Sequence, residues 1–202
     1  MSLGSTEKLT EGIISPEKAL LDLLESRINS YLWNKVYRKD IFEGILFPEG
    51  RVWEDAAVMY KVFLRTKRFY CLDQQLYTYL RREGSITTAI GVHALESMFR
   101  VRYGCYMDLL KNHPEFAYAA LPKAALASLR LIDRSLYEAV NQDTLADAKA
   151  FLQDNRKVIL NNRPDFEYKL YFSAPKVYNI LRIYKHRIGT VVKKLRLLMK
   201  KF

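Results

Sequence analysis

Two adjacent carboxylates, Glu54 and Asp55, are the side chains of this sequence best placed to do chemistry. They open a segment, residues 54–67, in which apolar residues recur at helical spacing, so we expect both acids in the first turn of a helix. Acids in that position complement the helix dipole, a contribution of about 0.3–1 kcal/mol. Alternatively, a carboxylate held at a helix start, under a loop containing Trp53, can act as a general base toward a substrate hydroxyl. The spacing by itself favours the dipole interpretation.

Other patterns that bind cofactors or metals are missing from the sequence. It has 8 Gly, no GxGxxG or GxxxxGK[ST] loop for phosphate, and no Asp-x-Asp pair for a divalent cation. His93, His113 and His186 lie far apart without neighbours at metal-ligand spacing, so we predict no metal site and no cofactor held by this chain alone. Cys71 and Cys105 are expected to be buried, reduced thiols of a cytosolic protein.

The positive charge is concentrated at the C-terminus. The 202 residues include 33 Lys or Arg and 22 Asp or Glu, a net charge of +11, and residues 169–202 hold ten of the basic residues and no acid. The remainder is nearly neutral. Such a tail indicates an anionic partner surface, either lipid or nucleic acid. The sequence contains no uninterrupted run of about 18 apolar residues, so we predict no membrane span.

The same tail has a strict apolar pattern with alternating steps of four and three residues, which predicts one face of a long helix. That face comprises Val177, Leu181, Tyr184, Ile188, Val191, Leu195, Leu198 and Phe202. Three interpretations stay open: the face docks on the chain's own core, lies on an anionic membrane, or pairs with a second chain. In the membrane interpretation, the cations beside the face meet the lipid; these are Lys185, Lys193, Lys194 and Arg196.

The elements that must position Glu54 and Asp55 mix helix and strand signals. Ser15 and Pro16 are typical of a helix start, and we expect that helix to end near Ser30. Strands are predicted at residues 31–37, 68–72 and 76–80, the last two as a hairpin. Later helices are predicted at residues 91–111, 122–141, 144–155 and 175–202.

The expected fold class is therefore α+β with helix dominant. A small incomplete sheet or hairpin within residues 31–80 is followed by a helical region and a long basic C-terminal helix. We expect residues 1–14 to be a leader or linker, 15–90 a mixed region, 91–168 a helical region and 169–202 the basic amphipathic segment. A few short strands make a poor sheet alone, which indicates that more of the sheet lies outside this chain.

Four segments, in order, resemble motifs of bacterial family 2 glycosyltransferases. Residues 31–38, Y-L-W-N-K-V-Y-R, resemble the family's W-N-K-L-Y-R, and residues 45–50, I-L-F-P-E-G, resemble its I-R-F-P-E-G. Glu54-Asp55 stands in the place of its E-D pair. Residues 76–86, L-Y-T-Y-L-R-R-E-G-S-I, resemble its Y-x-Y-R-x-R-x-G-S-I, with Leu80 where the family often has Arg. The resemblance covers roughly residues 16–88.

The resemblance implies that this chain is the C-terminal half of a GT-A enzyme, without its N-terminal nucleotide-binding half. Residues 15–90 would then form the acceptor side, and Asp55 would be the base, with Glu54 shaping the site. Trp33, Asn34 and Lys35 would lie where donor and acceptor meet. Arg82 and Ser85 would approach the leaving diphosphate, for which an Arg fork is well suited.

The implied reaction is inverting transfer of a sugar from a nucleotide-sugar donor to a polysaccharide or lipid-linked acceptor, with Mg or Mn in the parent enzyme. Such an enzyme would build cell-envelope polysaccharide, in the cytoplasm or peripherally on the inner face of the plasma membrane, and this fragment would be inactive alone. The alternative is a non-enzymatic helical module that binds an anionic membrane or nucleic acid through its tail. Nucleic acid is disfavoured because the body is neutral and most aromatics lie outside the basic run, and a homodimer stays open.

Overall fold

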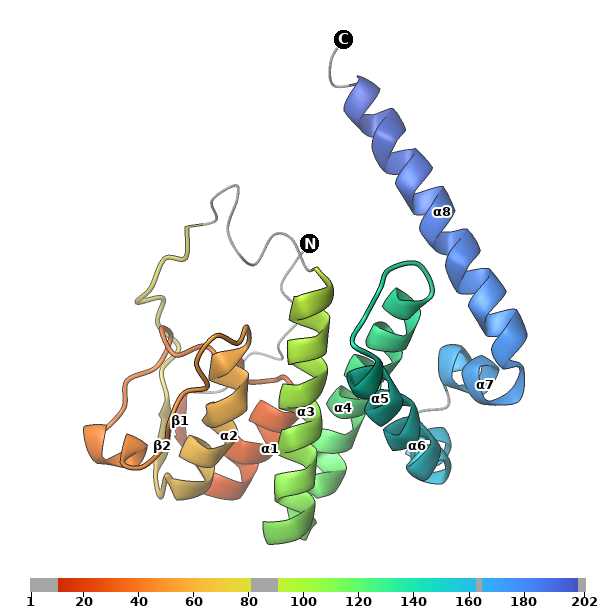
Figure 1. The fold of residues 1–202 in the computed structure, drawn as a ribbon. Helices are drawn as coiled ribbons and strands as arrows, with labels where there is room; N and C mark the ends of the chain where they lie inside the picture. Colours follow the sequence, from red (N-terminus) through yellow and green to blue (C-terminus); the bar gives the residue numbers. More distant parts are fainter. Residues whose placement is uncertain (1–10, 81–90, 163–164, 200–202) are drawn as a thin grey trace. The chain divides into compact units, whose positions relative to one another are not determined.

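The computed structural model describes residues 11–80, 91–162 and 165–199, and helices dominate it (Figure 1). Within these ranges the chain forms eight α-helices, one short 3-10 helix and one two-stranded antiparallel sheet. The predicted helix-dominant α+β class is confirmed. The chain divides into two compact units, residues 1–127 and 128–202, which we describe separately. None of the described helices has the length and apolarity that a membrane span requires.

The first unit has helix α2 at its centre, in contact with α1, α3 and the 3-10 helix η1. Its core includes Leu20 of α1, Met59 of α2, and Phe99 and Leu109 of α3, all fully buried. In chain order its elements are β1 (Gly12–Ile14), α1 (Pro16–Leu24), η1 (Lys39–Phe42), α2 (Glu54–Arg65), β2 (Phe69–Cys71), α3 (Val92–Asn112) and the first part of α4 (Pro114–Ser135).

Helix α1 begins as predicted but ends earlier than predicted. The Ser15 hydroxyl accepts a hydrogen bond from the Lys18 amide at 3.2 Å, which is the expected N-cap. The helix ends at Leu24 rather than near Ser30 because the amides of Arg27 and Ile28 donate to the Asp22 carbonyl at 2.8 and 2.9 Å. These bonds satisfy a carbonyl at the helix end and turn the chain away from the helix axis.

The sheet is not the predicted hairpin. Strand β2 forms where expected, but it pairs antiparallel with β1, with Ile13 opposite Tyr70. Residues 76–80 form no strand, and β1 lies inside the segment predicted as a leader. Residues 31–37 are not a strand either, because the Lys35 ammonium draws the carbonyls of Asn29 and Tyr31 into a compact loop.

The second unit contains the rest of α4, then α5 (Gln142–Asp154), α6 (Arg156–Asn162), α7 (Phe166–Ser173) and α8 (Pro175–Met199). Consecutive helices from α5 to α8 contact one another. Asn141 caps α5, since its side-chain oxygen accepts from the Thr144 amide at 2.9 Å. Within α4 the expected start at Pro122 is wrong: the helix begins at Pro114, and Pro122 lies inside it.

Candidate active site

The chain enters helix α2 through a left-handed turn at Trp53, with φ 71° and ψ 30°. That conformation is uncommon for a bulky residue and persists where the surroundings enforce it. Here helix α3 enforces it: the Trp53 indole donates to the Ala94 carbonyl at 3.2 Å, and the Ser97 hydroxyl donates to the Val52 carbonyl at 2.6 Å. The start of α2 is therefore fixed by groups more than 40 residues away in sequence.

Asp55, the predicted base, lies in the first turn of α2 and is half-buried, whereas Glu54 beside it is exposed. One carboxylate oxygen accepts from the Ser30 hydroxyl at 3.1 Å, and the other accepts from the Ala56 amide at 2.6 Å. Each carboxylate oxygen has lone pairs for more than one donor, so an oxygen bound in this way can still accept a proton. The geometry is compatible with both the dipole interpretation and the general-base interpretation.

Ser30 reaches Asp55 because the turn after α1 is anchored on Asp22. The Asp22 carboxylate is buried and forms ion pairs with Lys18 and with Arg27, the latter at 2.8 Å. Ser26, inside this turn, adopts a left-handed φ of 70°. The turn thus directs the following residues toward the start of α2. Sequence reasoning found no role for Ser30, since nothing local connects it with Asp55.

Lys35 fastens the loop beside Asp55. Its ammonium donates to the Asn29 and Tyr31 carbonyls at 2.6 and 2.8 Å and to the Asn34 side-chain oxygen at 2.7 Å. An ammonium has three hydrogens, and these three acceptors use them all. Desolvation lowers the pKa of Lys35 to about 8, although the negative charge of Asp55 acts in the opposite direction. Lys35 and Asn34 are thus brought together near Asp55, with the Lys35 ammonium as donor and the Asn34 side-chain oxygen as acceptor of one hydrogen bond.

Trp33 stands at the centre of an aromatic cluster. Its ring stacks on those of Tyr31, Tyr77 and Tyr79, with centroid distances of 4.9, 4.6 and 5.3 Å. Trp33 is 38% exposed, and Tyr77 and Tyr79 are also exposed. The cluster joins residues 31–33 to residues 77–79, which the sequence placed in separate motifs. Arg82 and Ser85, the other two predicted substrate-binding residues, lie outside the described residues.

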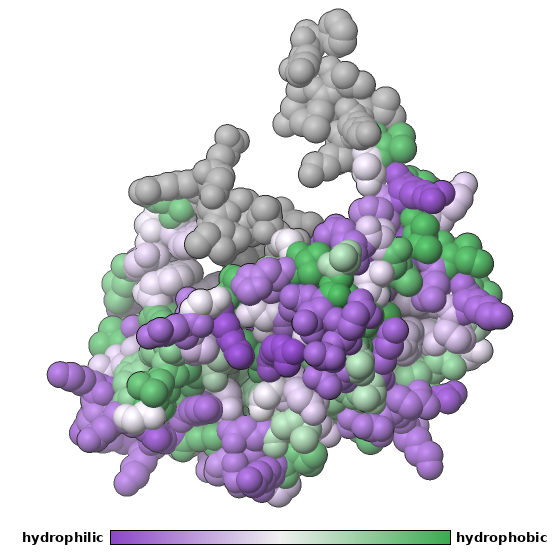
Figure 2. All heavy atoms as spheres, in the orientation of Figure 1, coloured by the Kyte–Doolittle hydropathy of each residue, from purple (hydrophilic) through white to green (hydrophobic). Residues whose placement is uncertain are grey.

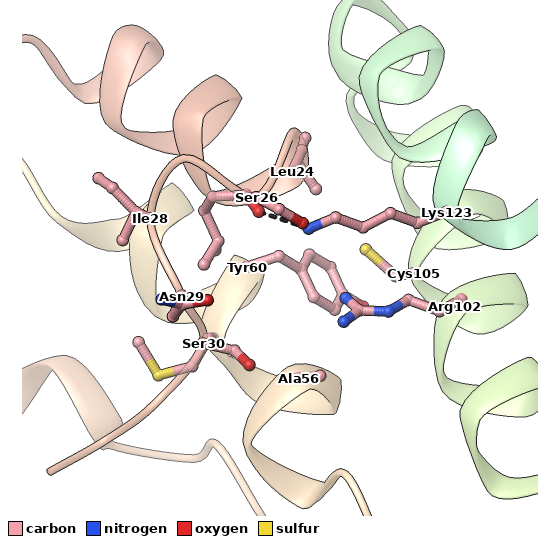
Figure 3. A pocket seen from close by; sticks show the side chains of 12 residues that line it. Leu24, Ser26, Ile28, Asn29, Ser30, Ala56, Tyr60, Arg102, Cys105 and Lys123 are labelled. Carbon is pink, nitrogen blue, oxygen red and sulfur yellow. Dashed lines mark hydrogen bonds between the residues drawn. The ribbon is translucent and has the colours of Figure 1, made fainter. Parts of the chain in front are cut away.

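A basic pocket lies in the same unit, between the turn after α1 and helices α2, α3 and α4. Figure 3 shows Arg102 and Lys123 reaching from two helices toward the segment that carries Ser26 and Ser30. The cavity holds about 60 Å³. The Lys123 ammonium donates to the Leu23 carbonyl at 2.8 Å. Neither basic residue belongs to a recognisable motif, so sequence reasoning could not find this pocket.

Burial lowers the pKa values of both basic residues of the pocket, and the charge of Asp55 shifts the pKa values of groups near it. Desolvation lowers the pKa of Arg102, while the charge of Asp55 acts in the opposite direction. Desolvation, helped by the charge of Arg102, lowers the pKa of Lys123 to about 7. Desolvation also raises the pKa of Tyr37, and Asp55 adds to that rise. Asp55 therefore acts electrostatically on Lys35, Tyr37 and Arg102, two of which are basic.

In the described ranges, no three His, Cys, Asp or Glu side chains come together as a metal site. Cys105 is buried and Cys71 is half-buried, and both are free thiols. The start of α2 and the loop beside it bring together one positioned carboxylate, nearby cations and an aromatic surface.

Part of the chain is similar to known glycosyltransferases. Over 66 residues it is 35% identical to glycosyltransferase GlyA of Streptococcus pneumoniae serotype 4, a match that spans 31% of this chain and 10% of that relative. Over 52 residues it is 35% identical to glycosyltransferase GlyG of the same organism, spanning 26% of this chain and 17% of that relative. The chain thus corresponds to a small part of each relative. No protein-family model and no solved structure matches it.

Proposed function

We propose that this chain supplies the acceptor side of a glycosyltransferase and that Asp55 is its general base. The similarity to two glycosyltransferases supports the reaction class. The observation that carries the assignment of Asp55 is its hydrogen bond from Ser30 at 3.1 Å, at the start of a helix whose entry is fixed by α3. A base must be held in one orientation toward its substrate, and these contacts provide that orientation.

In the proposed reaction, an acceptor hydroxyl attacks the anomeric carbon of the donor sugar while its proton passes to Asp55. The new bond joins the acceptor oxygen to that carbon, and the bond from the same carbon to the diphosphate breaks. The nucleoside diphosphate leaves with the electron pair, and the configuration at the carbon inverts. Glu54 is exposed in the same helical turn, and in this proposal it adds negative charge near the acceptor.

The aromatic cluster around Trp33 is the proposed acceptor platform. Sugar rings carry apolar C–H faces that pack on exposed aromatic rings, and a cluster of stacked rings is rigid enough to orient them. This supports a polysaccharide or lipid-linked glycan as acceptor. In this proposal the nucleotide sugar and the Mg or Mn are held by the rest of the parent enzyme.

The test is to replace Asp55 by Asn in the complete parent enzyme. We expect turnover to fall by about 10²–10⁴-fold, the usual contribution of a general base, while nucleotide-sugar binding is unchanged. Asp143→Asn is the matched control, because Asp143 also lies in the first turn of a helix, α5, and is exposed. If both variants keep near-normal turnover, Asp55 serves only the helix dipole.

The alternative, a non-enzymatic module acting through the C-terminal helix, has one observation in its favour: the exposed apolar face of α8. That face is compatible with an enzyme as well, so it does not replace the glycosyltransferase proposal. A purified parent protein that transfers no sugar from a panel of nucleotide-sugar donors, yet binds anionic vesicles, would support the module.

A further inference from the structure

Helix α8 presents a continuous apolar surface to solvent. We call Val177, Leu181, Tyr184, Ile188 and Val191 the α8 seam; their exposed fractions lie between 49% and 65%. Ile180 and Val192 flank the seam and are exposed too. Figure 2 shows hydrophobic residues at the surface along α8, beside strongly hydrophilic ones. A single exposed apolar side chain is common on protein surfaces, but a row of them along a helix indicates an interaction surface.

The seam is exposed because α8 is attached to its unit by another row of residues. The Tyr178 side chain is buried, and its hydroxyl donates to Asp133 at 2.5 Å. Arg182 pairs with the same Asp133 and with Glu167, the latter at 3.0 Å. His186 stacks on Tyr137, with ring centroids 3.7 Å apart.

Tyr178, Arg182 and His186 are spaced by four residues and so form one row along the helix. At about 100° per residue, that row lies roughly 100° or more around the helix from the seam. Attachment by this polar row leaves the seam facing away from the second unit. Among the described residues of the second unit, the seam is therefore not docked.

Positive charge lies on both sides of the seam. Lys185 is on one side and Arg187 on the other, and both are exposed. No Asp or Glu follows Glu167 in the sequence, so no acid on α8 offsets them. The helix continues to Met199 with further cations at Lys193, Lys194 and Arg196.

These charges select among possible occupants of the seam. In a paired helix from a second copy, both flanks would bring cations against cations, with no acid on either helix to match them. A nucleic acid would match the cations but leave the apolar seam in water. An anionic lipid surface matches both features, since the seam can enter the acyl boundary while the flanking cations meet the headgroups.

We propose that α8 lies in the interface of an anionic membrane, with the seam toward the acyl chains. The polar row of Tyr178, Arg182 and His186 then holds the second unit on the membrane surface. This inference does not depend on the proposed glycosyl transfer, because it uses only the surface of α8.

The experiment is co-sedimentation of the full chain with vesicles of phosphatidylcholine containing about 30% phosphatidylglycerol, a typical anionic composition. We expect binding that weakens with salt and is at least about tenfold weaker on pure phosphatidylcholine. Ile188→Ser with Val191→Ser should lower the partition coefficient by about tenfold or more. Val158→Ser, at an exposed apolar residue of α6, is the matched control and should bind as the wild type does.

A second pair of variants tests the charges. Lys185→Gln with Arg187→Gln should weaken binding to anionic vesicles, whereas Lys149→Gln with Lys157→Gln, the same loss of charge at exposed sites of α5 and α6, should not. Binding that the seam variant leaves unchanged would overturn the proposal. It would also be overturned by a dimer in light scattering that the seam variant dissociates, or by salt-dependent RNA or DNA binding without vesicle binding.

Discussion

At the start of α2, two separate stretches of the chain hold the residues in place, whereas α8 is held by one row of residues in its first three turns. Ser30 holds Asp55, and α3 holds Trp53 and Val52. Beyond His186, the described side chains of α8 are exposed. Residues held by hydrogen bonds from several parts of the chain suit a catalytic group, which must meet the reacting atom in one geometry. A helix held only at its start suits binding to a lipid surface, because contacts with lipid do not require one fixed geometry.

The largest effect is expected from breaking the attachment of α8 with Asp133→Ala. The variant leaves Tyr178 and Arg182 without their shared buried acceptor, and breaking such a buried pair costs about 3–5 kcal/mol. We expect the free energy of unfolding of the second unit to fall by that order in urea denaturation. Hydrogen exchange should show lost protection at the start of α8 and unchanged protection in α2.

The control for this variant is Asp154→Ala, since Asp154 is an exposed acid at the end of α5. Its effect should stay within about 0.5 kcal/mol, as for most surface substitutions. If Asp133→Ala changes the stability no more than Asp154→Ala does, then α8 is held by something other than this row. The comparison between the start of α2 and α8 would then be wrong about how α8 is held.

A second test concerns the left-handed turn at Trp53. Trp53→Ala and Trp53→Gly both remove the indole and its bond to Ala94, but only Gly adopts φ 71° without strain. We therefore expect the Gly variant to be the more stable by about 1–2 kcal/mol, the usual cost of the left-handed region for a residue with a Cβ. Thermal and urea unfolding of the two variants measure the difference.

Lys61, exposed within α2, offers the opposite expectation as a control. There the backbone is helical, so Lys61→Gly should be less stable than Lys61→Ala by about 1 kcal/mol. If Ala is also preferred at Trp53, the turn rearranges once the indole is gone. The start of α2 would then be less firmly held than the hydrogen bonds indicate.

Local patterns in the sequence predict several of the helices, because helical spacing and capping are local, but they predict no separate helix at α6 or α7. The Ser15 cap, residues 54–67 and residues 144–155 all correspond to helices in the structure, with ends shifted by a few residues. The strand at β2 was also predicted, but not its partner β1, which lies more than 50 residues earlier. Strand pairing depends on which distant segment comes to lie beside a strand, and the residue pattern of one strand does not identify its partner.

The candidate site was predictable only in part for the same reason. Asp55 and Trp33 came from contiguous motifs. Ser30, Arg102 and Lys123 meet around the start of α2 only because α1, α3 and α4 pack there, and no spacing rule links them. The aromatic composition of residues 31–37 predicts a strand, but the Lys35 ammonium binds the carbonyls of a loop there instead.

The smallest expected effect is on the pH dependence of stability, and it tests how tightly the basic pocket is packed. Burial and the charge of Arg102 lower the pKa of Lys123 from 10.5 to about 7, against the opposing effects of Cys105 and Glu25. Between these values the unfolded chain holds a proton that the folded chain has lost, so the free energy of unfolding rises with pH above about 7. Lys35, whose pKa is lowered to about 8, adds a rise of the same sign.

Lys123→Met should therefore reduce, but not abolish, the increase in stability from about pH 6.5 to about pH 8.5, measured by urea unfolding at each pH. The window stops there because burial raises the pKa of Cys105 from 9.0 to about 12, which adds a slope of the opposite sign at higher pH. Lys149→Met, at an exposed residue of α5, should leave the slope unchanged. An unchanged slope in Lys123→Met would mean that water reaches the ammonium in the folded chain. The pocket would then be open to solvent, and only Asp55 and its hydrogen-bond partners would be firmly held at the start of α2.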